Sequence, residues 1–199
     1  MELQKNAFKA AIAAGQVQIG IWSSLASNIG AEILSDAGFD WILLDTEHSP
    51  NEVADLVTQL QAAQRGTASP IVRPAWNDLV LIKRVLDLGP QTILVPYVQT
   101  RDEAVAAVAA AHYPPKGMRG VAGGARASRY GRVTDYLKKA TEPYRIYLTW
   151  FVARDAADFS PEKFPVFIRI SGDRSMYGAP AVDGVTVKAT LDGRGAPTP

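Results

Sequence analysis

Three side chains that can transfer protons or bind a metal ion follow one apolar stretch of the chain. The stretch is residues 41–44, and the side chains are those of Asp45, Glu47 and His48. A short unbroken apolar run is typical of a strand that is buried on both faces in a parallel sheet. Histidine is the natural acid or base near neutral pH, so this cluster suggests acid–base chemistry. The alternative is an acidic cluster that only complements the dipole of the next helix.

The residues after this cluster predict the start of a helix. Ser49 is a candidate N-cap and Pro50 suits the first helical position, which predicts a helix from about Pro50 to Gln64. In α/β barrels the catalytic groups lie at the carboxyl ends of the parallel strands. The cluster therefore marks a candidate active site at such an edge.

Apolar and amphipathic stretches alternate along the first part of the chain. This alternation predicts βα units around a parallel sheet. Polar or aromatic side chains end each expected strand, among them Trp22 and Arg73. Residues 113–130 contain two prolines, three arginines and a Gly-Gly pair, and predict a long mobile loop that could bind anions. The expected strands are 18–22, 41–44, 69–74 and 92–96, and the expected helices are 27–37, 50–64, 79–86 and 102–111.

The composition limits the classes of function. The chain has 199 residues and a formal net charge of +1, which gives no electrostatic reason to expect nucleic acid or an anionic membrane as a partner. It contains no cysteine, which excludes disulfides and thiolate chemistry. The first residues form an amphipathic pattern rather than a signal peptide, and no apolar run is long enough to span a bilayer. We expect a cytoplasmic protein.

Five motifs occur in one order along the first part of the chain. Together they resemble the HpcH/HpaI family of class II, metal-dependent pyruvate aldolases (4-hydroxy-2-oxoheptanedioate aldolase type). The resemblance implies a (β/α)8 barrel that cleaves 4-hydroxy-2-oxo acids to pyruvate and an aldehyde. The motifs are Asp45-x-Glu-His-x-Pro-Asn51, Val72-Arg-Pro-x-Trp-Asn-Asp78, Leu86-Asp-x-Gly89, Gln91-Thr-x-Leu-Val-Pro96 and Tyr113-Pro-Pro-x-Gly-x-Arg-Gly120.

The resemblance also implies roles for the site residues. His48 would be the catalytic base, acting directly or through a metal-bound water, and Asp87 would orient its imidazole. Arg73 would hold the carboxylate or enolate of pyruvate, with Trp22 also in the substrate site. Taken alone, Arg73 could instead be a surface arginine beside prolines, and Asp87 a helix C-terminal residue. We expect His48, Arg73 and Asp87 to converge on one face of the sheet.

The family uses a divalent ion (Mg, Mn or Co), and Asp45 and Glu47 would lie near its water ligands. The family's metal ligands are a Glu in a Gln-x-Glu-Thr strand and an Asp in a Gly-Pro-x-Asp-Leu motif. Neither motif occurs after Pro143, so we expect the ligands to be absent and activity to be impaired. The resemblance ends near this point. Residues 1–142 are predicted to form the N-terminal half of a TIM-type barrel, about four βα units.

Residues 143–199 have a different character. Short β-like runs at 147–151, 166–170 and 185–191, separated by turn signals, predict a short antiparallel β or irregular segment. The segment resembles a fragment of flavin-dependent amine oxidases of the monomeric sarcosine oxidase and N-methyltryptophan oxidase group. The motifs are Thr149-Trp-Phe, Phe164-Pro-Val-Phe167, Tyr177-Gly-x-Pro180 and Gly184-Val-x-Val-Lys188.

In that resemblance Lys188 would match the lysine beside the flavin, although it could equally be an exposed lysine on a strand. The chain has no Gly-x-Gly-x-x-Gly fingerprint, so no FAD is expected. A gene fusion, a frameshift or rearrangement, and deliberate construction could each have joined the two segments.

Two functions therefore remain. The first is an aldolase-type carbon–carbon lyase that acts on a small oxo acid and an aldehyde. The second is a truncated or fused remnant without catalysis that at most binds pyruvate-like oxo acids. A half-barrel exposes its sheet edges, so a homo-oligomer is expected in either case.

Overall fold

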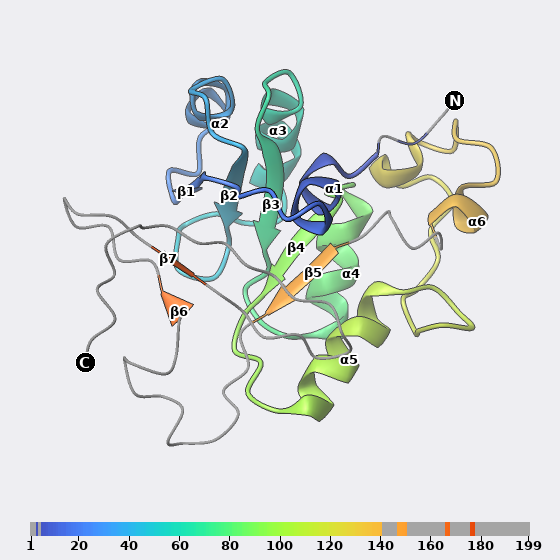
Figure 1. The fold of residues 1–199 in the computed structure, drawn as a ribbon. Helices are drawn as coiled ribbons and strands as arrows, with labels where there is room; N and C mark the ends of the chain where they lie inside the picture. Colours follow the sequence, from blue (N-terminus) through green and yellow to red (C-terminus); the bar gives the residue numbers. More distant parts are fainter. Residues whose placement is uncertain (1–2, 4, 141–146, 151–165, 168–175, 178–199) are drawn as a thin grey trace, which may run out of the picture.

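A parallel β-sheet organises the protein (Figure 1). The computed structural model describes residues 3, 5–140, 147–150, 166–167 and 176–177. Within this part, five strands follow the order β1-β2-β3-β4-β5, so each strand pairs in parallel with the next along the chain. The strands are β1 (Gly20–Ser23), β2 (Trp41–Asp45), β3 (Ser69–Arg73), β4 (Thr92–Val95) and β5 (Tyr147–Trp150); β6 (Val166–Phe167) and β7 (Met176–Tyr177) form a separate antiparallel pair.

Helices connect the first four strands and cover the sheet (Figure 1). Helix α2 packs against α3, and α4 against α5. None of the described helices is long and apolar enough to cross a bilayer. The helices are α1 (Ala7–Ala13), α2 (Asn28–Ser35), α3 (Asp55–Ala63), α4 (Leu79–Asp87), α5 (Arg101–Ala111) and α6 (Tyr136–Ala140), with the 3-10 turn η1 (Arg126–Ser128) between α5 and α6.

The βα alternation expected from the sequence is confirmed for the first four strands, and the helix after residue 50 begins later than expected. The Ser49 hydroxyl donates to the Asp45 carbonyl oxygen and accepts from the Asn51 N–H. It thus closes a loop instead of capping a helix. Helix α3 starts at Asp55, after a residue that supplies no side-chain cap.

The expected antiparallel arrangement of residues 147–151 is wrong for Tyr147–Trp150. These residues form β5, which pairs in parallel with β4 from Thr92 to Val95. Parallel pairing needs a long crossover, and the chain between the two strands, which includes α5 and α6, provides one. Strand β6 lies within the expected run 166–170 and pairs in the expected antiparallel sense, but its partner β7 lies where no strand was expected. The expected run at 185–191 and Lys188 lie outside the described residues.

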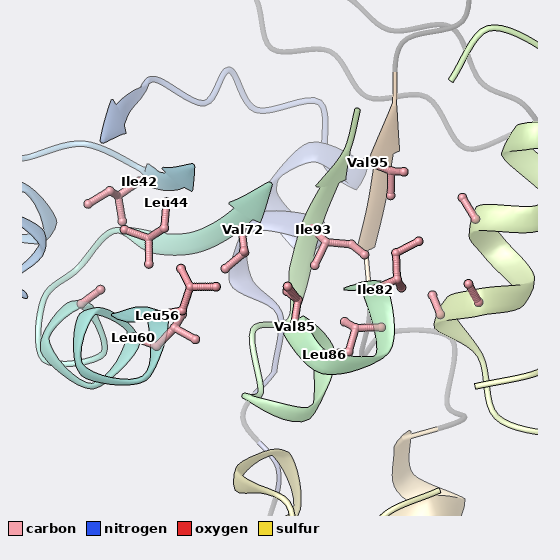
Figure 2. Packing of buried hydrophobic residues seen from close by; sticks show 14 of the residues in the cluster. Ile42, Leu44, Leu56, Leu60, Val72, Ile82, Val85, Leu86, Ile93 and Val95 are labelled. Atoms are coloured by element: carbon pink, nitrogen blue, oxygen red, sulfur yellow. The ribbon is translucent and has the colours of Figure 1, made fainter. Parts of the chain in front are cut away.

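The hydrophobic core lies between the sheet and its helices (Figure 2). Its strand and helix residues are almost completely buried, and burying such a side chain stabilises the fold by about 1.5–3 kcal/mol. Burial on this scale fixes the directions of the strands, and therefore the positions of the residues at their ends. The labelled core residues are Ile42, Leu44, Leu56, Leu60, Val72, Ile82, Val85, Leu86, Ile93 and Val95.

Helix α1 lies at the amino-terminal end of the sheet. The Asn6 side chain accepts a hydrogen bond from the Lys9 N–H, which caps the helix. Its amide donates to the Gln91 carbonyl oxygen at 2.9 Å and to Thr92 Oγ1 at 3.0 Å, just where β4 begins. The polar cluster of the sequence lies at the other end of the strands, because Asp45 and Arg73 are the last residues of β2 and β3.

Candidate active site

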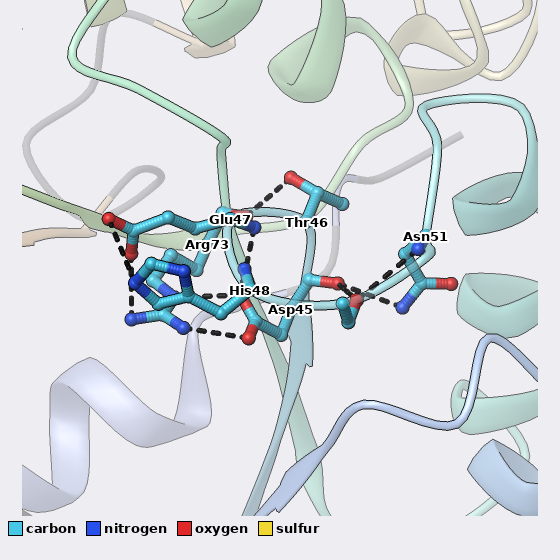
Figure 3. Close-up of polar contacts among 7 residues, drawn as sticks. Asp45, Thr46, Glu47, His48, Asn51 and Arg73 are labelled. Atoms are coloured by element: carbon cyan, nitrogen blue, oxygen red, sulfur yellow. Dashed lines mark hydrogen bonds and ion pairs between the residues drawn. The ribbon is translucent and has the colours of Figure 1, made fainter.

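An arginine links the ends of two neighbouring strands (Figure 3). Arg73 at the end of β3 is in register with Asp45 at the end of β2. Its Nε donates to Asp45 Oδ1 and its Nη2 to Asp45 Oδ2, both at 2.7 Å, and its Nη1 lies 2.7 Å from Glu47 Oε2. Two-point pairing between a guanidinium and a carboxylate fixes both groups in orientation as well as in distance. The sequence-predicted Arg73, Asp45 and Glu47 therefore form one rigid cluster.

The Asp45 carboxylate is buried, with 1% of the residue exposed. Burial raises the pKa of this group, but the hydrogen bond from Arg73, the Glu47 N–H, the charge of Arg73 and the Trp22 side chain together outweigh it. The pKa of Asp45 consequently lies below its usual value of 3.8, and the group is ionised near neutral pH.

A second hydrogen-bond network holds the loop after β2. Thr46 bonds the Arg73 carbonyl oxygen through its N–H at 3.0 Å and its hydroxyl at 2.6 Å. The Asn51 amide donates to the Asp45 carbonyl oxygen at 2.9 Å, and Gln59 Nε2 donates to Asn51 Oδ1 at 2.7 Å. The sequence did not indicate that Asn51 links the end of β2 to Gln59 in α3, although the residue closes the first motif. This network sets the direction in which Glu47 and His48 leave the strand.

His48 is the accessible member of the site. Its side chain is 74% exposed, and its Nε2 lies 3.6 Å from Glu47 Oε1. Trp22 at the carboxyl end of β1 stacks beneath Arg73, whose guanidinium carbon is 4.7 Å from the centroid of the indole ring. An exposed imidazole and an arginine held in a fixed orientation thus lie against the same Glu47 carboxylate, one at each of its oxygens.

The expected convergence of Asp87 with His48 and Arg73 is wrong within one copy of the chain. Asp87 is the last residue of α4, and Arg119 Nη2 donates to its Oδ1 at 2.7 Å. Helix α4 starts after the carboxyl end of β3 and runs back, so it ends just before β4 starts. Asp87 is therefore at the opposite end of the sheet from His48. The resemblance implied His48 as the partner of Asp87, whereas the partner within this chain is Arg119.

The charges of the cluster limit what it can bind. Two carboxylates and one guanidinium sum to a net negative charge, which disfavours an anionic oxo acid unless a cation or a protonated His48 is near. A guanidinium has five N–H donors, and the contacts to Asp45 and Glu47 in the described part of the chain use three of them. The remaining donors can reach a substrate oxygen.

The described residues do not supply a complete set of metal ligands. Among them, no group of three or more His, Asp or Glu side chains could hold an ion. Both carboxylate oxygens of Asp45 and the Oε2 of Glu47 are paired with Arg73, and the Oε1 of Glu47 faces His48. Strand β5, which pairs with β4, has the sequence Tyr-Leu-Thr-Trp, without a carboxylate.

The fold and the site define part of a parallel α/β barrel with a polar cluster at the carboxyl ends of its strands. The sequence matches the HpcH/HpaI aldolase/citrate lyase family over residues 18–172, and the chain belongs to that family. The match continues past residue 142, where the sequence motifs predicted that the resemblance ends.

Named relatives agree with this family. The chain is 47% identical to a 4-hydroxy-2-oxo-heptane-1,7-dioate aldolase of Escherichia coli over 178 residues, which is 89% of this chain and 66% of that protein. It is 56% identical to a pyruvate aldolase of Rhizobium etli over 142 residues, or 71% of this chain and 56% of that protein. The chain thus spans 66% or less of the length of these two relatives.

Solved structures agree as well. A HpcH/HpaI aldolase/citrate lyase family protein from Burkholderia cenocepacia superposes with a TM-score of 0.69 at 36% identity, covering 74% of this chain and 58% of that one. Macrophomate synthase superposes with a TM-score of 0.59 at 27% identity, covering 72% of this chain and 51% of that one. The parallel arrangement of the strands is therefore that of the family.

Proposed function

We propose that this chain carries the substrate-binding and proton-transfer half of a pyruvate aldolase type lyase, which cleaves 4-hydroxy-2-oxo acids to pyruvate and an aldehyde. The observation that carries the proposal is the Arg73 guanidinium, which Asp45 and Glu47 hold beside the exposed imidazole of His48. The names of the relatives supply the substrate class.

In this proposal His48 accepts the proton of the C4 hydroxyl. The C3–C4 bond then breaks to release the aldehyde, and its electrons move to the C2 oxygen to form the enolate of pyruvate. The remaining N–H groups of Arg73 hold the carboxylate or the enolate, and Trp22 forms one wall of the substrate site. Protonation of the enolate at C3 gives pyruvate. In the family a divalent ion stabilises the enolate; Asp45 and Glu47 would lie near its water ligands.

We further propose that lyase activity in this chain is low. The family's Gln-x-Glu-Thr and Gly-Pro-x-Asp-Leu motifs do not occur after Pro143, so divalent metal is expected to bind weakly or not at all. Loss of an enolate-stabilising charge typically slows a reaction by at least ~100- to 1000-fold. A non-catalytic oxo-acid binder is the second candidate, favoured by the commitment of Asp45 and Glu47 to Arg73.

An assay of oxaloacetate decarboxylation and of retro-aldol cleavage, with added Mg²⁺, Mn²⁺ or Co²⁺, tests the proposal. We expect rates at least ~100-fold below those of ordinary enzymes, which turn over at about 1–1000 s⁻¹, and weak metal binding by calorimetry. Ordinary turnover that a chelator abolishes would contradict the impairment. If pyruvate binds but no cleavage occurs with any of the three metal ions, the chain is a non-catalytic oxo-acid binder.

We also propose a separate origin of residues 143–199 in a flavin amine oxidase; four short motifs support it, whereas the aldolase family match extends into the segment as far as residue 172. It predicts no function for that segment, because the dinucleotide fingerprint is absent and FAD is not expected. Flavin absorption in the visible spectrum of the purified protein would contradict the expected absence of FAD.

We also propose that the chain forms a homo-oligomer. In the described part, β1 and β5 each have a strand neighbour on one side only. Beside β1, large apolar side chains are exposed, including Leu25, Ile29 and Ile33, each between 64% and 66% exposed. Open sheet edges and apolar patches favour association. Light scattering on a size-exclusion column is expected to give a mass of at least two chains, and a monomer across the concentration range would contradict the proposal.

A further inference from the structure

A basic cavity lies at the amino-terminal end of the sheet, on the side opposite the candidate active site. Its volume is about 410 Å³, and its lining includes Ser69 and Thr92, the first residues of β3 and β4. Four basic side chains line it, and no Asp or Glu is among its described lining residues. A concave surface with charge of one sign and no neutralising partner attracts ions of the opposite sign. The four are Lys5, Arg126, Arg129 and Arg132.

Arg126 is the fixed part of this cavity. Its Nη2 donates to Gln64 Oε1 at 2.9 Å, and its Nη1 donates to the Leu88 carbonyl oxygen. Burial lowers the pKa of its guanidinium, because the charged form is less fully solvated there. Arg129 and Arg132 are exposed, and neither is in an ion pair within the described residues. One anchored and two free guanidinium groups thus face the same space.

A second observation comes from the adjoining pocket of about 50 Å³, which shares Leu3, Gly89 to Gln91 and Ala127 with the basic cavity. Arg119 lines this pocket and is only 1% exposed. Its Nη2 is paired with Asp87, but its Nε has no hydrogen-bond partner in the described part of the chain. A buried N–H without a partner is costly, so a ligand oxygen that reached the Nε of Arg119 would be stabilised there.

Backbone groups do not compete with the side chains for a ligand. Arg129, Tyr130 and Gly131 have left-handed conformations, with φ of 52°, 58° and 80°. Their N–H groups bond within the loop, to the Arg126 and Ala125 carbonyl oxygens and to Ser128 Oγ. The turn therefore presents arginine side chains to the cavity rather than a row of free amides.

We propose that this cavity binds a small organic molecule with two or more negative charges, of the phosphate ester or di- and tricarboxylate type. Several guanidinium groups suit such anions because each offers a planar pair of donors to two oxygens. The cavity lies at the other end of the sheet from His48 and Arg73, so the ligand is not the lyase substrate. It occupies a separate site whose existence does not depend on the proposed lyase activity.

Calorimetry on the full chain at constant ionic strength tests the site, with citrate, inorganic phosphate and acetate as probes. We expect citrate or phosphate to bind and acetate, with a single charge, to bind at least about tenfold more weakly. The preference between citrate and phosphate distinguishes a carboxylate ligand from a phosphate ligand.

The decisive variant is Arg129→Gln/Arg132→Gln, which removes two exposed charges from the cavity. Its affinity for the bound anion is expected to fall at least about tenfold. The control Arg101→Gln/Lys116→Gln loses the same charge at exposed positions outside the lining and should change affinity less than about twofold. Equal affinity of the two double variants, or no binding of citrate and phosphate to the unaltered chain at about 10 mM, would overturn the proposal.

Discussion

Replacing Arg73 with methionine is expected to lower the free energy of unfolding by about 3–5 kcal/mol, because the change leaves the buried Asp45 carboxylate without its partner. Methionine keeps much of the length of the arginine side chain and can still pack on Trp22, so the effect isolates the charge. Urea unfolding followed by circular dichroism at pH 7 measures the difference.

The same variant should reverse the pH dependence that Asp45 contributes. In the unaltered chain the pKa of Asp45 lies below 3.8, so its contribution to stability is complete above that pH and is lost as the pH falls through the folded value. Without Arg73, burial is left as the main influence and raises the pKa of Asp45 above its unfolded value. The free energy of unfolding of Arg73→Met should therefore rise as the pH falls from 7 towards 4, whereas that of the unaltered chain should not.

Arg73→Met/Asp45→Asn is the matched control. It removes both charges, so it should be clearly more stable than Arg73→Met alone at pH 7 and should lose the inverted pH dependence. A decrease of less than about 1 kcal/mol for Arg73→Met would show that Asp45 is not held as described.

Replacing His48 with alanine is expected to lower the residual rate of oxaloacetate decarboxylation or retro-aldol cleavage by about 100- to 10,000-fold, as the loss of a general base does. The unfolding free energy should change by less than about 0.5 kcal/mol, because the side chain is 74% exposed. A large loss of rate without a loss of stability is the signature of a catalytic group. The rates are measured at high protein concentration with Mn²⁺ present.

His112→Gln is the matched control, since His112 is the other histidine and its side chain has one polar contact among the described residues, from Nδ1 to the Val108 carbonyl oxygen at 2.8 Å. It should leave the rate unchanged within about twofold. Added imidazole should restore part of the rate of His48→Ala but not exceed the control. Equal rates for the two variants would remove His48 from the mechanism.

The sequence predicted the part of the fold that depends on local pattern. The apolar run of β2 and the following charged residues correctly placed Asp45, Glu47 and Arg73 at one edge, because parallel strands end together. Each of these features is determined within a few residues or by neighbouring strands.

Contacts between distant segments were not predictable in this way. The pairing of Arg119 with Asp87 joins residues 32 positions apart, and no periodicity links a loop arginine to a helix end. The parallel pairing of Tyr147–Trp150 with β4 depends on the free edge of β4, which local pattern does not reveal. The segment 113–130 was predicted to be mobile, yet Arg119 and Ser128 are buried within it.

The contact of Asn6 with Gln91 and Thr92 has a consequence for the order of folding. Strands β1 to β4 pair with their neighbours in sequence, so the sheet can grow by closing loops of moderate length. Asn6 and Gln91 are 85 positions apart, and their hydrogen bond can form only after β4 has joined β3. The docking of α1 is thus expected late on the folding pathway. The first segment made during synthesis would then wait for the fourth strand before it acquires its native contacts.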